Sequence, residues 1–310
     1  MSEATRDRVR RAADDLGYVP SSSASGLASG RTMAMGAIVP GLALPFCAEV
    51  IEGVDAVLRS ESYDLIVFSL GQHGGERERV FRRTILRRRT DALIALCIDF
   101  DAEERRQLVA TGNPVMVVGG AVRGLPHVAI DQAGAARMAT RHLIELGHTC
   151  IAHLSGAGLP EGTKATTVRR REGYESALRD AGIPVRSELA IRADTDPAMT
   201  RRGLAAMLTA REPRPTACFA DSDSLGVMAI LVAEGVGMRV PSELSVAGID
   251  DHGLAEVFGL TAIAQDPFDQ GATAARMLLD QLAGRRTRLR SARHPVRLVE
   301  RGSTAPLAAG

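Results

Sequence analysis

Acidic and hydroxyl side chains follow the apolar, strand-like runs of this sequence, at Ser69, Asp131, Ser155, Asp194, Asp221, Asp250 and Asp266. In open α/β sheets, ligands bind beyond the carboxyl ends of the strands. Carboxylates in that position can accept hydrogen bonds from the hydroxyl groups of a small polar ligand. They can also cap the helices that follow, which is the commoner role for any one of them. Taken as a set, they predict a site for a small polar molecule.

Motifs of catalysis and of metal or cofactor binding are missing. The sequence has no G-x-x-x-x-G-K-[ST], H-E-x-x-H or G-x-S-x-G pattern, and Gly119, Gly120 and Gly124 lack the spacing of a dinucleotide loop. Neither the seven histidines nor the four cysteines show metal-ligand spacing. We therefore expect no metal, no cofactor and no enzyme. The sequence predicts free thiols, no export signal and no membrane span, which favours a cytoplasmic protein.

Ten apolar runs are predicted to be buried strands, and helical patterns lie between them. The runs are Met35–Pro40, Tyr63–Leu70, Asp91–Ile98, Pro114–Gly120, His127–Asp131, Cys150–Gly156, Glu188–Asp194, Thr216–Asp221, Leu244–Asp250 and Leu260–Asp266. Runs that are apolar throughout are typical of parallel strands covered on both faces. Ten strands are too many for one small sheet. We expect an α/β fold with two doubly wound parallel lobes, divided near Gly147–Thr149.

The first twenty residues read as a short helix with an apolar stripe formed by Val9, Ala12, Ala13 and Leu16. Ser2 can cap its start and Gly17 its end. One helix of this length is marginal alone in water, so the stripe needs a partner. The stripe alone is equally compatible with packing on the body and with the last helix of a small bundle. A connector rich in Ser and Gly, residues 21–32, follows the helix.

Several segments together closely resemble the lac repressor (LacI/GalR) family of bacterial transcription regulators, from Ser2 to about Ser303. The segments are SEATRDRVRRAADDLGYVP, GRTMAMGAIVP, VAIDQAGAARMATRHLIELGH, RREGYESAL and PSELSVAGIDD. Members of this family have a helix-turn-helix head, a hinge helix and a two-lobed core similar to periplasmic sugar-binding proteins. By this resemblance the chain begins after the two helices that enter and brace the major groove. A start codon placed too far downstream accounts for this better than a genuine truncation.

The resemblance also implies a division of the chain. Residues 1–20 would be the remnant of the head and residues 21–32 the hinge. Residues 33–147 plus 264–293 would form the N-terminal subdomain of the core, and residues 148–263 plus 294–303 its C-terminal subdomain. Residues 304–310 would be a tail, without the leucine heptads of a tetramerising coiled coil.

Effector-binding residues carry over from the family onto the predicted cleft. Asp131, Arg170, Asp221 and Asp250 match family positions, although Ala220 replaces the polar residue that the family has before Asp221. The full expected set is Leu44, Phe46, Ser69, Asp131, Arg170, Asp221, Asp250 and Gln265. The alternative is that Asp221 and Asp250 cap helices and that Arg170 offsets their charge. Both interpretations can hold together.

The implied function is a ligand-responsive repressor that acts as a homodimer. The hinge would fold on operator DNA, where Leu27, flanked by Ala24 and Ala28, would wedge into the minor groove. A small polar metabolite, sugar-like, would bind between the lobes. A net charge of +1 confines any nucleic-acid contact to a local surface. The alternatives are a solute-binding protein, a sensor core without DNA binding, and an enzyme on a Rossmann-like sheet.

Overall fold

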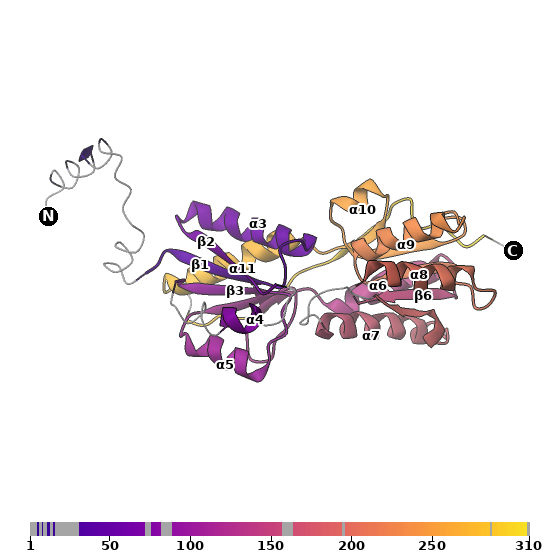
Figure 1. Cartoon of the computed structure of the whole chain (residues 1–310), viewed down its shortest axis with the longest axis horizontal. Helices are drawn as coiled ribbons and strands as arrows, with labels where there is room; N and C mark the ends of the chain where they lie inside the picture. The colour runs from indigo at the N-terminus through magenta and orange to yellow at the C-terminus, as the bar shows by residue number, and fades with distance from the viewer. Residues whose placement is uncertain are drawn as a thin grey trace.

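The computed structural model describes residues 31–71, 76–81, 89–156, 164–193, 196–285 and 287–308, together with residues 5, 8, 11, 12 and 15. These five N-terminal residues are helical, and Ala12, which was predicted on the apolar stripe, is exposed. The hinge residues Ala24, Leu27 and Ala28 lie outside the described residues, so their role stays a prediction. The rest of the described chain forms two lobes side by side (Figure 1).

The first lobe is a six-stranded parallel sheet in the order β11-β5-β4-β3-β1-β2, covered by helices on both faces. Helices α3 and α11 cover one face, and α4 and α5 lie on the other (Figure 1). The bounds are β1 Ala34–Val39, α3 Pro45–Ser60, β2 Asp64–Ser69, α4 Glu76–Arg79, β3 Ala92–Leu96, α5 Ala102–Ala110, β4 Val115–Val118, β5 His127–Ala129, α11 Pro267–Leu282 and β11 Ala292–Arg293.

The second lobe repeats this architecture with the strand order β12-β10-β9-β8-β6-β7. Helices α6 and α7 pack on one face of its sheet, and α8 and α9 on the other. The bounds are α6 Gln132–Glu145, β6 Ile151–Ser155, α7 Lys164–Asp180, η3 Ser187–Leu189, β7 Ala190–Arg192, α8 Pro197–Thr209, β8 Ala217–Ala220, α9 Asp223–Gly235, β9 Ser245–Asp250, α10 Gly253–Val257, β10 Thr261–Ala264 and β12 Arg297–Val299.

The chain crosses between the lobes three times among the described residues. The crossovers join β5 to α6, β10 to α11 and β11 to β12. The strand ends that lead into the first two crossovers therefore lie beside the other lobe. This arrangement brings strand-end side chains of both lobes to one place.

The predicted α/β fold with two doubly wound sheets is confirmed, and each of the ten predicted strands overlaps an observed strand. The division expected near Gly147–Thr149 falls after α6, whereas the chain already enters the second lobe between β5 and α6. Two short strands were missed. β11 and β12 lie in an arginine-rich segment with no apolar run, and β12 pairs antiparallel with β10. Their pairing depends on the third crossover, which places this segment at the edge of both sheets. No helix of the described residues is both long and apolar enough to span a membrane.

Helices α3 and α11 cross with their backbones in direct contact. A Cβ on Gly53 would overlap the carbonyl oxygen of Phe268, and a Cβ on Gly271 would overlap that of Val50. Any other residue at either position would force the two helices apart. The two glycines therefore determine how closely α11 packs against α3, the helix that begins at the cleft.

Candidate functional site

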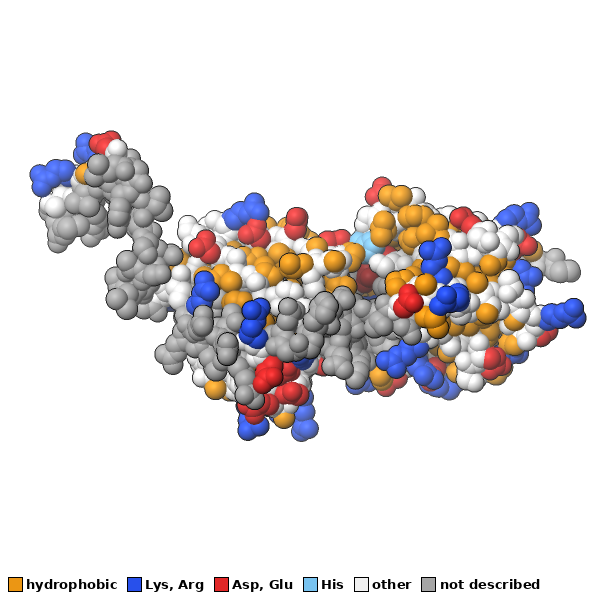
Figure 2. Space-filling model, viewed as in Figure 1, with side chains coloured by type: hydrophobic (Ala, Val, Ile, Leu, Met, Phe, Trp, Pro, Cys, Tyr) orange, Lys and Arg blue, Asp and Glu red, His pale blue; other side chains and the backbone are white. Residues whose placement is uncertain are grey.

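A cavity of about 280 Å³ lies between the two lobes, where the molecular surface is notched (Figure 2). Residues from both lobes line it. They are Leu44, Pro45, Phe46, Cys47, Cys97, Gly119 and Gln132, then Thr166, Thr167, Arg170, Asp221, Ser222, Ser224, Leu225, Asp250, His252 and Gln265. This size is just below the usual range of about 300–1,000 Å³ for small-molecule sites, so the cavity suits a small ligand.

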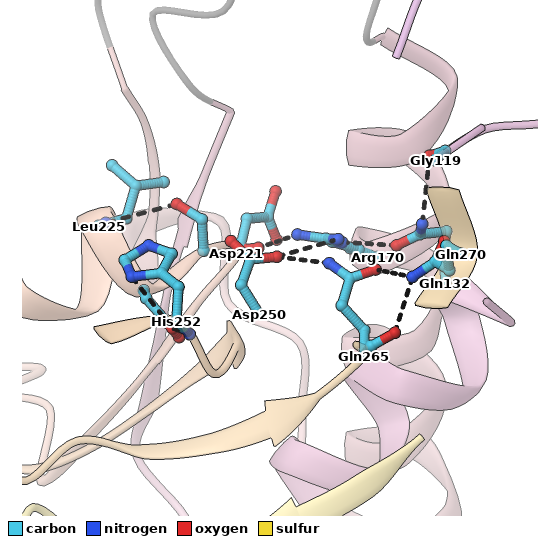
Figure 3. Close-up of polar contacts among 11 residues, drawn as sticks. Gly119, Gln132, Arg170, Asp221, Leu225, Asp250, His252, Gln265 and Gln270 are labelled. Atoms are coloured by element: carbon cyan, nitrogen blue, oxygen red, sulfur yellow. Dashed lines mark hydrogen bonds and ion pairs between the residues drawn. The ribbon is translucent and has the colours of Figure 1, made fainter. Parts of the chain in front are cut away.

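Arg170 is the cation at the centre of this cleft, and its side chain is only 9% exposed. It projects from α7, and its Nε donates to Gln132 Oε1 at 2.8 Å. Its Nη1 donates to the carbonyl oxygen of Asp221. Its Nη2 lies 4.0 Å from Asp250 Oδ1. In Figure 3 the guanidinium lies between the two aspartates on one side and Gln132 on the other. A buried guanidinium held at Nε and Nη1 keeps Nη2 to offer a ligand.

Asp221 follows β8, and both of its carboxylate oxygens are held by the protein. His153 Nε2 lies 2.9 Å from Oδ1, and the Gly156 amide donates to Oδ2 at 3.1 Å. The His153 ring stacks with both Tyr174 and Phe219, with centroids 4.7 and 5.2 Å away. Ser222, not Asp221, caps α9. The capping interpretation of Asp221 is therefore wrong, and its carboxylate is a fixed acceptor at the cleft floor.

Asp250 ends β9 in an unusual backbone conformation, with φ at 133°. Its Oδ1 accepts a hydrogen bond from Gln265 Nε2 at 2.5 Å. Burial raises the pKa of Asp250, whereas the nearby Arg170 and the Gln265 hydrogen bond lower it. His252, not Asp250, caps α10, so the capping interpretation is wrong here too. Asp250 and Arg170 Nη2 instead present an acceptor and a donor side by side.

A second buried carboxyl, Asp223, lies beneath this pair. Burial, and next the charge of Asp250, raise the pKa of Asp223 to about 8. Its Oδ2 accepts the His252 backbone N–H at 2.9 Å, whereas its Oδ1 has no hydrogen-bond partner among the described residues. At neutral pH this group holds a proton, which limits the negative charge under the cleft.

The structure brings six of the eight expected residues to the cleft, namely Leu44, Phe46, Arg170, Asp221, Asp250 and Gln265. It does not bring Asp131 there. Asp131 caps α6 through Gly134 N, and its carboxylate is 43% exposed, 3.4 Å from Arg293 Nη1. Ser69 is exposed at the end of β2, an edge strand of the first sheet, and accepts from Gly71 N. Ser69 is not among the residues that line the cavity.

Several polar residues of the cleft were missed by the sequence analysis, namely Gln132, Thr166, Thr167, Ser222, Ser224 and His252. Each lies close in sequence to a predicted residue. Gln132 directly follows Asp131, and because Asp131 turns outward to cap α6, Gln132 takes the inward place. Thr166 and Thr167 lie one helical turn before Arg170 on α7, a spacing that places them on the same side.

Comparison with known proteins places this cleft in a family. Residues 140–304 match the model of a periplasmic binding protein-like domain. The chain is 32% identical over 311 residues to the HTH-type transcriptional repressor PurR of Yersinia pestis, covering 98% of this chain and 89% of that repressor. The chain belongs to the LacI family of transcriptional regulators. The missing catalytic motifs agree with this finding, because the relatives are regulators and not enzymes.

Solved structures of LacI-family members share the two-lobed fold. The transcriptional regulator CelR in complex with cellobiose is 30% identical, with a TM-score of 0.78, and the match covers 98% of this chain and 91% of that one. A LacI family regulator from Enterococcus faecium with bound ribose is 26% identical, with a TM-score of 0.76, over 89% of this chain and 100% of that one. Regulators of this family bind operator DNA and small-molecule effectors.

Proposed function

We propose that this LacI-family chain is an effector-responsive repressor whose small, polar, sugar-like effector binds between the lobes. The observation that carries the proposal is the buried Arg170–Asp250 pair, which lines a cavity between two lobes that are joined by crossovers. A donor and an acceptor side by side suit a ligand with adjacent hydroxyl groups. Leu44, Phe46 and Leu225 supply apolar surface for the carbon face of such a ligand.

The expected route to DNA runs from the cleft through the first lobe to the segment before β1. Asp91 attaches that segment to the first lobe. Its carboxylate accepts hydrogen bonds from Thr32 N at 2.7 Å, Thr32 Oγ1 at 2.9 Å and Met33 N at 3.0 Å. Lobe closure on the effector would therefore move the start of the hinge together with the first lobe. Effector and operator would then bind with reciprocal coupling, because each prefers a different arrangement of the same lobes.

We further propose that the chain acts in the cytoplasm as a homodimer. Large apolar side chains of α10 and its end are exposed, with Leu254 at 42%, Val257 at 77% and Phe258 at 38%. Figure 2 shows hydrophobic side chains gathered over α10 and the neighbouring part of α9. A contiguous apolar patch of this kind suits a subunit contact. Sedimentation should give twice the monomer mass, and Val257→Asp should lower it.

The effector assignment is tested by replacing Arg170 and titrating ribose, cellobiose and a panel of pentoses, hexoses and disaccharides by calorimetry. Arg170→Ala removes two charge-assisted hydrogen bonds and leaves Asp250 without its cation. We expect binding of the best ligand to weaken about 100-fold or more. Arg171→Ala is the matched control, because Arg171 lies on the same helix with its side chain exposed and paired to Glu175.

Unchanged affinity in Arg170→Ala would refute the site.

DNA binding is tested separately, by selecting an operator from a random duplex library in the presence and absence of the bound ligand. Effector binding with no DNA selected would favour the alternative of a sensor core or solute-binding protein. Effector-dependent enrichment of one sequence would support the repressor.

A further inference from the structure

Two buried glutamines flank the crossover between β10 and α11. Gln265 lies directly after β10 of the second lobe and lines the cleft. Gln270 lies in the first turns of α11, which packs in the first lobe, and it is completely buried. Gln270 is not among the cleft-lining residues. Any influence of Gln270 on a ligand in the cleft must therefore pass through a neighbour.

The hydrogen bonds between these glutamines fix which way the Gln265 amide faces. Gln270 Nε2 donates to the Gln265 carbonyl oxygen at 2.7 Å and lies 3.3 Å from Gln265 Oε1. Gln265 Nε2 donates to Asp250 Oδ1 at 2.5 Å (Figure 3). A side-chain amide has its acceptor at one end and its donors at the other. Because Gln270 brings donors to the oxygen end, the NH2 end of Gln265 faces Asp250.

The opposite orientation would be repulsive. It would place the Gln265 oxygen against the Asp250 carboxylate and the Gln265 NH2 group against the NH2 group of Gln270. Gln270 Oε1 is itself buried and has no hydrogen-bond partner among the described residues. The hydrogen bonds of the Gln270 side chain among the described residues are therefore made by its donor end.

We propose that Gln270 is a positioning residue that acts from the first lobe, through Gln265, to hold Asp250 of the second lobe as the acceptor for the effector. The effector part of this proposal rests on the proposed function, but the orientation of Asp250 and Gln265 does not. The charged and titratable groups around Asp250 include Arg170 on α7, Asp223 on α9, His252 after β9, Cys97 after β3 and Glu49 on α3 across the cleft. The Gln265 hydrogen bond lowers the pKa of Asp250 against the effect of burial.

The experiment is a carboxyl 13C NMR titration of the ligand-free full chain, labelled at aspartate and assigned with Asp250→Asn. Gln270→Met keeps the side-chain length and removes both the donor and the unsatisfied oxygen. We expect Asp250 in this variant to titrate at a proton concentration about tenfold lower than in wild type, since its carboxylate loses a fixed donor. Gln107→Met on α5, where Gln107 Nε2 donates to Glu103, should leave the titration unchanged.

The route through Gln265 is tested by a double-mutant cycle. Gln265→Met should shift the Asp250 titration at least as far, and adding Gln270→Met should produce no further shift. Additive shifts, or an unchanged titration in Gln270→Met, would overturn the proposal. If the variants fail to fold, the wild-type protein still tests the hydrogen bond between Gln265 and Asp250. The side-chain amide protons of Gln265 must shift with the same midpoint as Asp250, and amide signals independent of pH would contradict the assignment.

Ligand-binding measurements distinguish a failure of this proposal from a failure of the proposed function. For a panel sugar that binds wild type, the affinity of Gln270→Met should fall more steeply than that of wild type as the pH is lowered, because Asp250 is protonated earlier. A shifted Asp250 titration in a protein that binds no panel ligand would support the positioning role and count against the sugar-like effector. Identical pH profiles would overturn the positioning role while leaving the effector site intact.

Discussion

Arg170 and the carboxyl groups around it show how burial changes what a charged residue does. Arg170 is surrounded by Gln132, the Asp221 carbonyl and Asp250, each from a different element. Arg170 compensates the buried charge of Asp250, whereas Asp223 below has no arginine or lysine paired to it among the described residues, and the His252 ring lies 3.8 Å away. That carboxyl stays protonated because desolvation disfavours its charged form.

Asp223 should therefore make stability depend on pH. Its folded pKa of about 8 lies above the value of an unfolded aspartate, near 4. The folded state binds the extra proton between these values, so stability falls as pH rises through this window. Chemical denaturation should show wild type losing on the order of several kcal/mol between pH 5 and pH 9. Asp223→Asn, which keeps the acceptor for His252 N–H, should be much less sensitive. Parallel pH profiles would contradict this.

At the scale of elements, helix contacts set how precisely the cleft walls are placed. α3 begins at the cleft with Pro45 and Phe46, and α11 begins at the second crossover. The two helices cross at Gly53 and Gly271, where their backbones are in contact and leave no room for a side chain. Gly119 makes a similar allowance at the end of β4. It has φ +82°, and a Cβ there would lie 2.6 Å from Cys97 Sγ and 2.7 Å from the Phe46 ring.

Two glycine-to-alanine changes in helices should have opposite signs. Gly271→Ala would push α11 away from Val50, and we expect the free energy of unfolding to fall by about 2–3 kcal/mol. Gly203 on α8 is exposed, with nothing within 4 Å of an added Cβ. Gly203→Ala should instead stabilise the protein by about 0.5–1 kcal/mol, because alanine loses less backbone entropy in a helix. Urea denaturation measures both, and equal effects would refute the close-crossing argument.

At the scale of the whole molecule, the cleft lies between two lobes that are connected by three crossovers. The described segment before β1 is bonded to Asp91 and, through Arg31, to Leu282 of α11, both in the first lobe. In the proposed function, a signal to the hinge therefore passes through that lobe. Effector binding in the proposed function requires both lobes, whereas the connection to the hinge requires the first lobe. A change at the hinge should consequently alter coupling without altering effector affinity.

Deletion of Ser21–Gly30 tests that separation. We expect calorimetric effector affinity to stay within about twofold of wild type, because no cleft residue is removed. The effector-dependent change in affinity for a selected operator should disappear. Measurement of operator binding by fluorescence anisotropy with and without effector decides this, and an undiminished effector response would show that coupling bypasses the hinge.

Much of the fold and part of the site followed from local sequence. Apolar runs predicted ten strands and two lobes, because burial is written into neighbouring residues. The six cleft residues came mainly from the resemblance to the family. Asp131 and Gln132 mark where this reasoning stopped. The two are adjacent at the start of α6, and only the tertiary structure shows that Asp131 caps the helix while Gln132 lines the cleft.

The sequence by itself determined that this chain has strands ending in polar groups, arranged in two α/β series. Tertiary structure alone decided which of those groups meet. The helix-capping roles went to Ser222 and His252, which left Asp221 and Asp250 for the cleft, and the docking of α7 brought Arg170 against Gln132 and Asp221. The physical reason is that hydrogen bonds between residues far apart in sequence depend on how whole elements dock, which no local pattern encodes.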